Sequence, residues 1–225
     1  MNKNNDFEMN DSADEPKMEG AGVHSMQKSA RSKVSIKQRL SAKRLALMAV
    51  FTALSYVVSL LEIPLPLFGA GFLKLDFGNV FIVLISFLLG PVEGLAVCAL
   101  KEGFRLIGST SNGAGEIANF LMTGSYLLLP SILYQYRRNL KTVVFSLLAS
   151  CVIATGVALI ANRFIIFPAF AALGDGTIFG NTVPQAFALF WVAILLFNLI
   201  KTVAVGILTM LLYKRLSNFL KKMKI

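Results

Sequence analysis

Histidine, cysteine and charged residues are scarce in this chain of 225 residues. The single histidine, His24, lies in a polar N-terminal region, so a histidine-based metal site or catalytic pair in the apolar part is excluded. The two cysteines, Cys98 and Cys151, lie in apolar segments without metal or redox spacing, which is typical of small core residues. The motifs GxxxxGK(S/T), HExxH and GxSxG are all absent. We therefore expect neither P-loop ATP hydrolysis nor any enzyme activity within the membrane.

Only 15% of the residues are charged, whereas 56% are hydrophobic, and the mean hydropathy is +0.68. This composition excludes an ordinary soluble domain and predicts a polytopic membrane protein in contact with the lipid bilayer. Residues 1–44 and 214–225 hold most of the charges behind the net +10. Basic flanks of membrane helices explain that charge, and no basic folded domain supports a nucleic-acid partner.

Apolar segments follow one another from residue 43 to residue 213. We place six of them, near 43–61, 77–90, 91–108, 115–136, 142–167 and 186–213. The second and third are short and separated only by Gly90-Pro91, so they predict a tight helical hairpin. The expected fold class is thus all-α, a polytopic membrane protein with six transmembrane helices in a domain over 43–213. A disordered tail, acidic and then basic, is expected over 1–42, and a basic tail over 214–225.

The distribution of basic residues predicts the orientation. Seven basic residues lie in the N-terminal tail near the first segment, three lie in 137–141 and five in 214–225, whereas loops 62–76, 109–114 and 168–185 hold only Lys74. By the positive-inside rule both termini are cytoplasmic, as in a multi-pass protein of the bacterial cell membrane. The two long outer loops, 62–76 and 168–185, mix proline and glycine with apolar residues. We expect them to fold over the outer mouth as a lid, although simple connection is the alternative.

Polar residues inside the apolar segments are the candidates for function. Lys201 lies within the apolar run Gln185–Tyr213, with Asn198 one turn before it. A charge at that depth costs roughly 3 kcal/mol or more, so we expect it to face a polar cavity, a partner or a ligand. Further candidates are Lys101, Glu102 and Arg105 on the third segment and Asn112, Glu116 and Asn119 at the start of the fourth. A buried ion-pair network that only joins helices, for example Glu102 or Glu116 with Arg105, is the alternative.

These groups suit a neutral polar ligand rich in carbonyl and imide groups, since amides donate and accept and lysine donates. Aromatic side chains that could stack on a flat ring are Phe72, Phe77, Phe104, Phe179, Phe190 and Trp191.

Small residues recur at short spacing on the first segment, at Ala42, Ala46, Ala49 and Ala53. Such spacing allows another helix to approach closely. Packing within the chain and docking of a partner membrane protein both remain open.

Three segments resemble the riboflavin-specific S components (RibU family) of energy-coupling factor transporters: FLKLDFGNV, LLGPVEGLAVCALKEGFRL and SNGAGEIANFLMTGSYLLLPSILY. The resemblance covers about residues 43–213. Its most specific parts are Lys74-Leu75-Asp76, the Leu-Gly-Pro turn and the Gly-Glu-x-x-Asn-Phe start of the fourth segment. Ala49-x-x-x-Ala53 resembles the family's coupling motif, and Asn198-x-x-Lys201 resembles its ligand-binding pair.

The resemblance implies a six-helix bundle that captures riboflavin from outside and then associates with a transmembrane coupling subunit and two ATPase subunits. It implies no cofactor, because riboflavin is the transported ligand. The expected ligand-binding residues are Lys74, Leu75, Asp76, Phe77, Lys101, Asn112, Glu116, Asn119, Trp191, Asn198 and Lys201, and the expected partner-docking residues are Ala49 and Ala53. An S component for another vitamin and an ion-coupled secondary carrier remain the alternatives.

Overall fold

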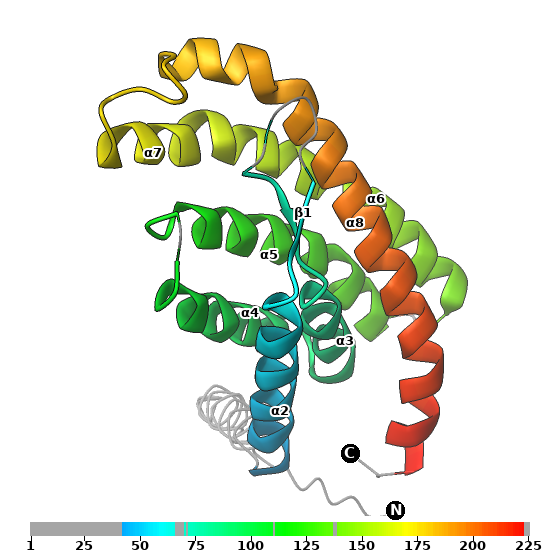
Figure 1. Ribbon diagram of the computed structural model, residues 1–225. Coiled ribbons are helices and arrows are strands. Elements are labelled where there is room, and N and C mark those ends of the chain that lie inside the picture. Colours follow the sequence, from blue (N-terminus) through cyan, green and yellow to red (C-terminus); the bar gives the residue numbers. More distant parts are fainter. Residues whose placement is uncertain (1–41, 66–69, 71, 110, 137–138, 223–225) are drawn as a thin grey trace, which may run out of the picture. The chain divides into compact units, whose positions relative to one another are not determined.

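The computed structural model describes residues 42–65, 70, 72–109, 111–136 and 139–222 (Figure 1). The expected tail over 1–42 lies outside the described residues except for Ala42, and so does the extreme C-terminus. Residues 214–222, expected to form a basic tail, continue the last helix.

Helices form at every apolar segment of the described chain (Figure 1). They are α2 (Ala42–Ser59), α3 (Asn79–Leu89), α4 (Pro91–Leu106), α5 (Ala114–Tyr136), α6 (Leu140–Ala161) with its extension α7 (Phe167–Leu173), and α8 (Val183–Lys222). One addition to the all-α expectation is a short antiparallel hairpin of β1 (Ile63–Pro64) and β2 (Lys74–Leu75), in which Ile63 pairs with Leu75 and Pro64 with Lys74.

Four helical stretches are long and apolar enough to cross a bilayer: Ala42–Ser59, Ala114–Tyr136, Lys141–Leu173 and Val183–Tyr213. The protein is therefore a membrane protein. Helix α3 is apolar but has only 11 residues. Helix α4 has 16 residues and carries Lys101, Glu102 and Arg105, so its sequence is too polar and too short for the same criterion.

Helix α3 lies at the centre of the bundle, where it packs against α4, α5 and α8. Ile82, Val83 and Ile85 are fully buried, which explains why its sequence is apolar on all faces. It turns sharply into α4 at Gly90, whose φ of +128° is open to glycine but not to residues with a Cβ. Pro91 then begins α4, where its missing N–H costs no helical hydrogen bond.

A wide helical turn, η2 (Asn162–Ile166), joins α6 to α7 without a break. Pro168 lies two residues after this turn. A proline ring clashes with the carbonyl four residues earlier in a regular helix, and the wider turn relieves that clash. The turn also directs Asn162 and Ile166 into the interior, where both are buried.

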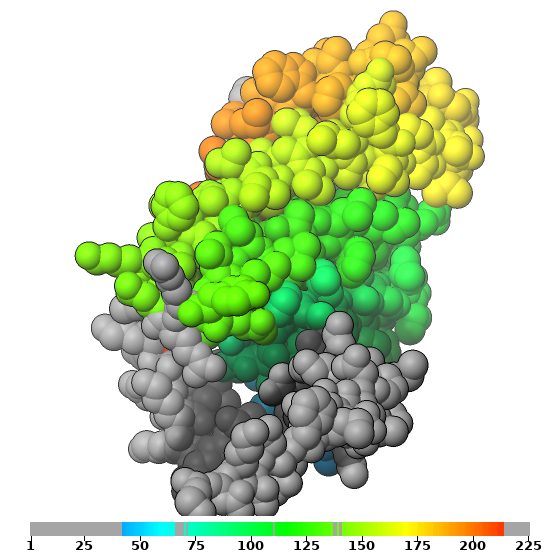
Figure 2. All heavy atoms as spheres, turned by 180° about the vertical axis from the view of Figure 1, so that it is seen from behind, coloured from blue at the N-terminus to red at the C-terminus, as the bar shows by residue number. Residues whose placement is uncertain are grey.

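On the opposite face of the molecule, α6 (yellow-green) lies alongside α5 (green) (Figure 2). Its outward side chains Phe145, Leu148 and Val152 are apolar and more than half exposed. Such a face suits hydrocarbon rather than water.

Candidate functional site

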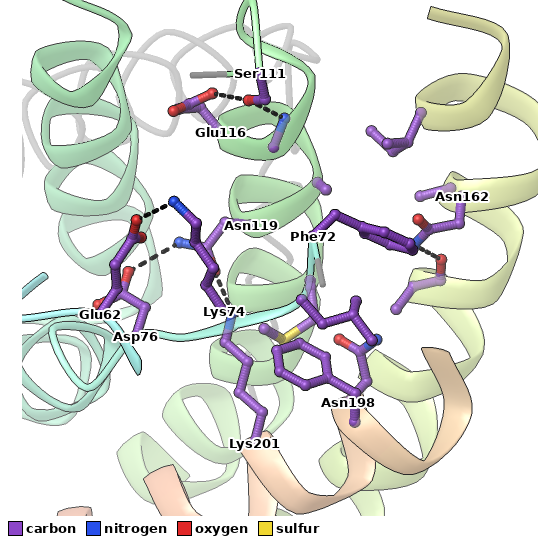
Figure 3. A pocket seen from close by; sticks show the side chains of 18 of the residues that line it. Glu62, Phe72, Lys74, Asp76, Ser111, Glu116, Asn119, Asn162, Asn198 and Lys201 are labelled. Atoms are coloured by element: carbon purple, nitrogen blue, oxygen red, sulfur yellow. Dashed lines mark hydrogen bonds and ion pairs between the residues drawn. The ribbon is translucent and has the colours of Figure 1, made fainter. Parts of the chain in front are cut away.

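A cavity of about 350 Å³ lies between the hairpin, α4, α5, the α6–α7 turn and α8 (Figure 3). That volume falls within the range of small-molecule sites, about 300–1,000 Å³. Its lining residues are Glu62, Phe72, Leu73, Lys74, Asp76, Glu102, Arg105, Ser111, Gly115, Glu116, Ala118, Asn119, Met122, Ala158, Ala161, Asn162, Ile166, Phe170, Phe197, Asn198 and Lys201.

Ion pairs hold the hairpin against α4 at one side of the cavity. Glu62 accepts hydrogen bonds from Lys74 Nζ at 2.5 Å and from Arg105 Nη2 at 2.6 Å. Arg105 also donates to the carbonyl of Ser59 at the end of α2, at 2.9 Å. Partial burial opposes ionisation of Glu62, but the hydrogen bonds from Lys74 and Arg105 outweigh it and hold its pKa below the usual value.

A second charged group lies deeper and is almost free of solvent. Lys101 on α4 is fully buried and forms ion pairs with Asp76 and, at 2.6 Å, with Glu102. Asp76 also accepts from the backbone N–H of Gly78 at 2.8 Å, which fixes the chain between the hairpin and α3. A Cβ at Gly78 would lie 2.2 Å from the carbonyl of Ser55, so only glycine fits this approach to α2.

The ion-pair network that the sequence left as an alternative is therefore present, but its partners differ from the expected ones. Arg105 pairs with Glu62 rather than with Glu102 or Glu116. Glu116 instead accepts from the hydroxyls of Ser109 at 2.8 Å and Ser111 at 2.9 Å. The network also forms one wall of the cavity, so joining helices and shaping a site are not exclusive roles.

Lys201 reaches the cavity from α8 and is only 5% exposed. Its Nζ donates to Asn119 Oδ1 at 2.6 Å and lies 5.8 Å from the centre of the Phe197 ring. Among the described residues no carboxylate lies within ion-pair distance of this ammonium. An ammonium has three N–H donors, so Lys201 keeps capacity for a ligand acceptor.

Two asparagines that line the cavity, Asn162 and Asn198, are held by the same kind of hydrogen bond (Figure 3). Asn198 Nδ2 donates to the carbonyl of Ile194 at 2.8 Å, and Asn162 Nδ2 donates to the carbonyl of Ala158 at 2.7 Å. Each amide nitrogen thus donates to a backbone carbonyl one turn earlier in its own helical segment. Each amide oxygen is left without a described protein donor and can accept from a ligand.

Aromatic side chains pack around Phe72, which lines the cavity. Phe72, which lies just before β2, stacks on Phe179 with ring centres 6.0 Å apart. It also makes edge contacts with Phe167 and Phe190, at 6.0 and 5.7 Å. Phe179 has a φ of +51°, an unusual conformation for a bulky residue. The two outer loops expected to cover the site therefore meet through these rings.

The structure brings together six of the expected ligand-binding residues and leaves five outside the lining. Lys74, Asp76, Glu116, Asn119, Asn198 and Lys201 line the cavity. Leu75, Phe77, Lys101, Asn112 and Trp191 do not. Lys101 lies behind the wall as the partner of Asp76, Asn112 is exposed, and Trp191 is 45% exposed. Leu75 alternates with Lys74 along β2, so the two point to opposite sides.

Sequence reasoning singled out neither Glu62 nor Asn162, which both line the cavity. Asn162 carries a usable signal, since it and the adjacent Arg163 interrupt an apolar run. Glu62 carries none, because it begins a loop and its two partners are 12 and 43 residues away.

Comparison with known proteins identifies this architecture. The family described as "ECF transporter, substrate-specific component" matches residues 43–213. The chain belongs to this family of energy-coupling factor (ECF) transporter subunits. "Riboflavin transporter RibU" of Staphylococcus aureus is 30% identical over 192 residues, 85% of this chain and 98% of that protein. "Riboflavin transporter FmnP" of Bacillus subtilis is 26% identical over 194 residues, covering 82% of this chain and 97% of that protein.

A solved structure described as "Structure and mechanism of the S component of a bacterial ECF transporter" superposes with a TM-score of 0.67 at 30% identity. The match covers 80% of this chain and 98% of that one. As an ECF substrate-specific component, this chain captures a substrate for an ECF transporter, and the cavity is its candidate substrate site.

The first helix of this S component presents a small-residue face outward. Ala49 and Ala53 are both exposed, whereas Phe51, Thr52 and Ser55 point into the bundle. The alanine face is therefore not used for packing among the described residues.

Proposed function

We propose that this S component binds riboflavin from outside the cell and delivers it to an ECF transporter. The observation that carries the proposal is Lys201, a buried ammonium with spare donors, in the same cavity as the free amide oxygens of Asn198 and Asn162. A flavin ring offers carbonyl acceptors to the ammonium and an imide N–H to an amide oxygen. Two relatives that match nearly over their full lengths carry the name riboflavin transporter.

The charge of the cavity wall also suits an uncharged ligand. Four acidic side chains, Glu62, Asp76, Glu102 and Glu116, are balanced by Lys74, Arg105 and Lys201 in the lining and by Lys101 directly behind it. No net charge remains to attract a charged substrate. Ribityl hydroxyls can exchange hydrogen bonds with such a wall, while Phe72 and Phe170 supply apolar surface for the ring.

The membrane arrangement we propose has six spans, with α3 and α4 as the two short ones and both termini in the cytoplasm. The charges of α4 are compatible with this arrangement because Lys101 and Glu102 are buried against Asp76 and Asn119 rather than exposed to lipid. The basic residues near both chain ends and at 137–141 support the orientation in a bacterial plasma membrane.

For transport we propose that the exposed alanine face of α2 docks onto an ECF transmembrane coupling subunit, which works with two ATPase subunits. Alanines at i, i+4 leave a groove where a partner helix approaches to backbone contact. The chain has no P-loop motif, so in this proposal the ATPase partners supply the driving force.

Ligand binding is tested by titrating the detergent-solubilised protein with riboflavin and recording quenching of flavin fluorescence. Lys201→Ala is the test variant. Thr209→Val is its matched control, because Thr209 is buried two turns further along α8 and does not line the cavity. We expect the parent and the control to bind and Lys201→Ala to bind more weakly. If the folded parent does not bind riboflavin at high micromolar concentration, riboflavin is not its ligand. Binding of a different vitamin under the same conditions would support the alternative, an S component for that vitamin.

A further inference from the structure

Asn119 on α5 is at the centre of the polar network, where it connects groups from four other parts of the chain. Its Oδ1 accepts from Lys201 Nζ at 2.6 Å and from Asn79 Nδ2 at 3.0 Å. Its Nδ2 donates to Glu102 Oε1 and, at 3.3 Å, to Asp76 Oδ2. These contacts join α8, α3, α4 and the end of the hairpin to one side chain.

The hydrogen-bonding capacity of Asn119 is fully used by these contacts. A carboxamide offers two lone pairs and two N–H groups. Lys201 and Asn79 occupy both lone pairs, and the two N–H groups are shared among Glu102, Asp76 and, at 3.4 Å, Asn79 Oδ1. Although Asn119 lines the cavity, it has nothing left to offer a ligand unless one of these bonds breaks. This differs from Asn162 and Asn198, whose amide oxygens have no described donor.

The amide also stands between the ammonium of Lys201 and the carboxylates of Asp76 and Glu102. Without an amide oxygen to accept its hydrogen bond, a buried ammonium turns to the nearest anionic oxygen, because an unpaired buried charge is costly. Asp76 and Glu102 are those oxygens, and both already pair with Lys101. Both carboxylates belong to the cavity wall in front of Lys101, so a Lys201 side chain drawn to them would turn toward that wall and use its donors there instead of on a ligand.

We infer that Asn119 is a positioning residue: it holds the Lys201 ammonium toward the ligand and away from the carboxylates, and does not itself contact riboflavin. This inference rests on the proposed function for its ligand. Its distinctive consequence is that removing Asn119 matters only while Lys201 is present.

A double-mutant cycle read by riboflavin fluorescence quenching tests this consequence. The proteins are the parent, Asn119→Ala, Lys201→Met and the double variant, each checked for a thermal unfolding transition without ligand. We expect each single variant to bind about tenfold more weakly, as for loss of a hydrogen bond to a charged group. The double variant should bind within about twofold of Lys201→Met, because residues that act through one contact are not additive.

Asn162→Ala, alone and with Lys201→Met, is the matched control. Asn162 also lines the cavity but does not contact Lys201, so its loss should multiply with that of Lys201. If Asn119→Ala does not fold, Asn119→Ser replaces it, since a serine is too short to reach both Lys201 and Asp76.

Multiplicative losses for Asn119 and Lys201 would overturn the inference and make Asn119 a direct ligand contact. If the parent binds riboflavin and the affinity losses of the two single variants multiply in the double variant, only the role of Asn119 is refuted. If the folded parent does not bind riboflavin, the proposed ligand is refuted, and the inferred role of Asn119 fails with it.

Discussion

Replacing Glu62 by glutamine should accelerate riboflavin release. Glu62 is the shared acceptor of Lys74 on the hairpin and Arg105 on α4, at 2.5 and 2.6 Å. The three side chains are 19–37% exposed, so each pair is worth less than a fully buried one. Partly exposed pairs contribute about 0.5–1 kcal/mol each, and glutamine keeps the shape but not the charge.

The loss summed over both pairs is therefore about 1–2 kcal/mol, which corresponds to about a five- to thirtyfold faster release if the hairpin must open for the ligand to leave. Stopped-flow displacement of bound riboflavin from protein in detergent or nanodiscs measures that rate directly. The association rate should change much less, as is usual for variants of one site.

Glu93→Gln is the matched control. Glu93 makes the same kind of ion pair, with Arg44 at 3.4 Å, but at the opposite end of α4 from Arg105. Twelve residues of helix put about 18 Å between the two positions. An unchanged release rate in Glu62→Gln, or an equal acceleration in Glu93→Gln, would refute a specific role for the hairpin ion pairs.

Four further outcomes are expected. Lys201→Ala and Asn198→Ala should each weaken riboflavin binding about ten- to a hundredfold by titration, with little change in melting temperature, because a ligand hydrogen bond in a dry site is lost; parent-like affinity in both would make the pair structural. Ala49→Trp with Ala53→Trp should abolish cellular uptake while sparing binding to the purified protein, and joint loss of both properties would contradict a docking face. Cells without an energy-coupling module should bind riboflavin but not accumulate it; sustained accumulation would favour a secondary carrier. The release rate should stay constant from neutral pH down to the usual glutamate value near 4.5 and rise only below it, because the hydrogen bonds from Lys74 and Arg105 hold the pKa of Glu62 below that value, so its ion pairs are lost only as the pH falls through the lowered pKa; a rise near pH 6 would point to another group.

Within the site, the residues predicted best were those whose polarity conflicts with their own segment. Lys201 and Asn198 lie within an apolar run, where exposure to lipid is costly, so the sequence predicts that they face a polar cavity, a partner or a ligand, and the structure places them in a cavity. Trp191 shows the limit of this reasoning, since an aromatic side chain is as stable in contact with lipid as in a binding site. The structure leaves Trp191 45% exposed and outside the cavity lining.

The π-type turn at Asn162–Ile166 was not predicted, although Pro168 was visible in the sequence. A proline in the sequence predicts a distortion of the helix but not whether the helix breaks, bends or widens. Packing of α6 and α7 against α5 and α8 decides that outcome, and with it whether Asn162 faces the cavity.

The sequence by itself determined the membrane class, the positions of the helices and the presence of a polar site, because hydrophobic run length, basic flanks and buried charge are local properties of the chain. Only the tertiary structure decided which charges pair. Glu62 with Arg105, and Asn119 with Lys201, are separated by 43 and 82 residues. Such pairs depend on how helices rotate and cross, which no local pattern specifies. That arrangement also carries the inference that Asn119 positions Lys201.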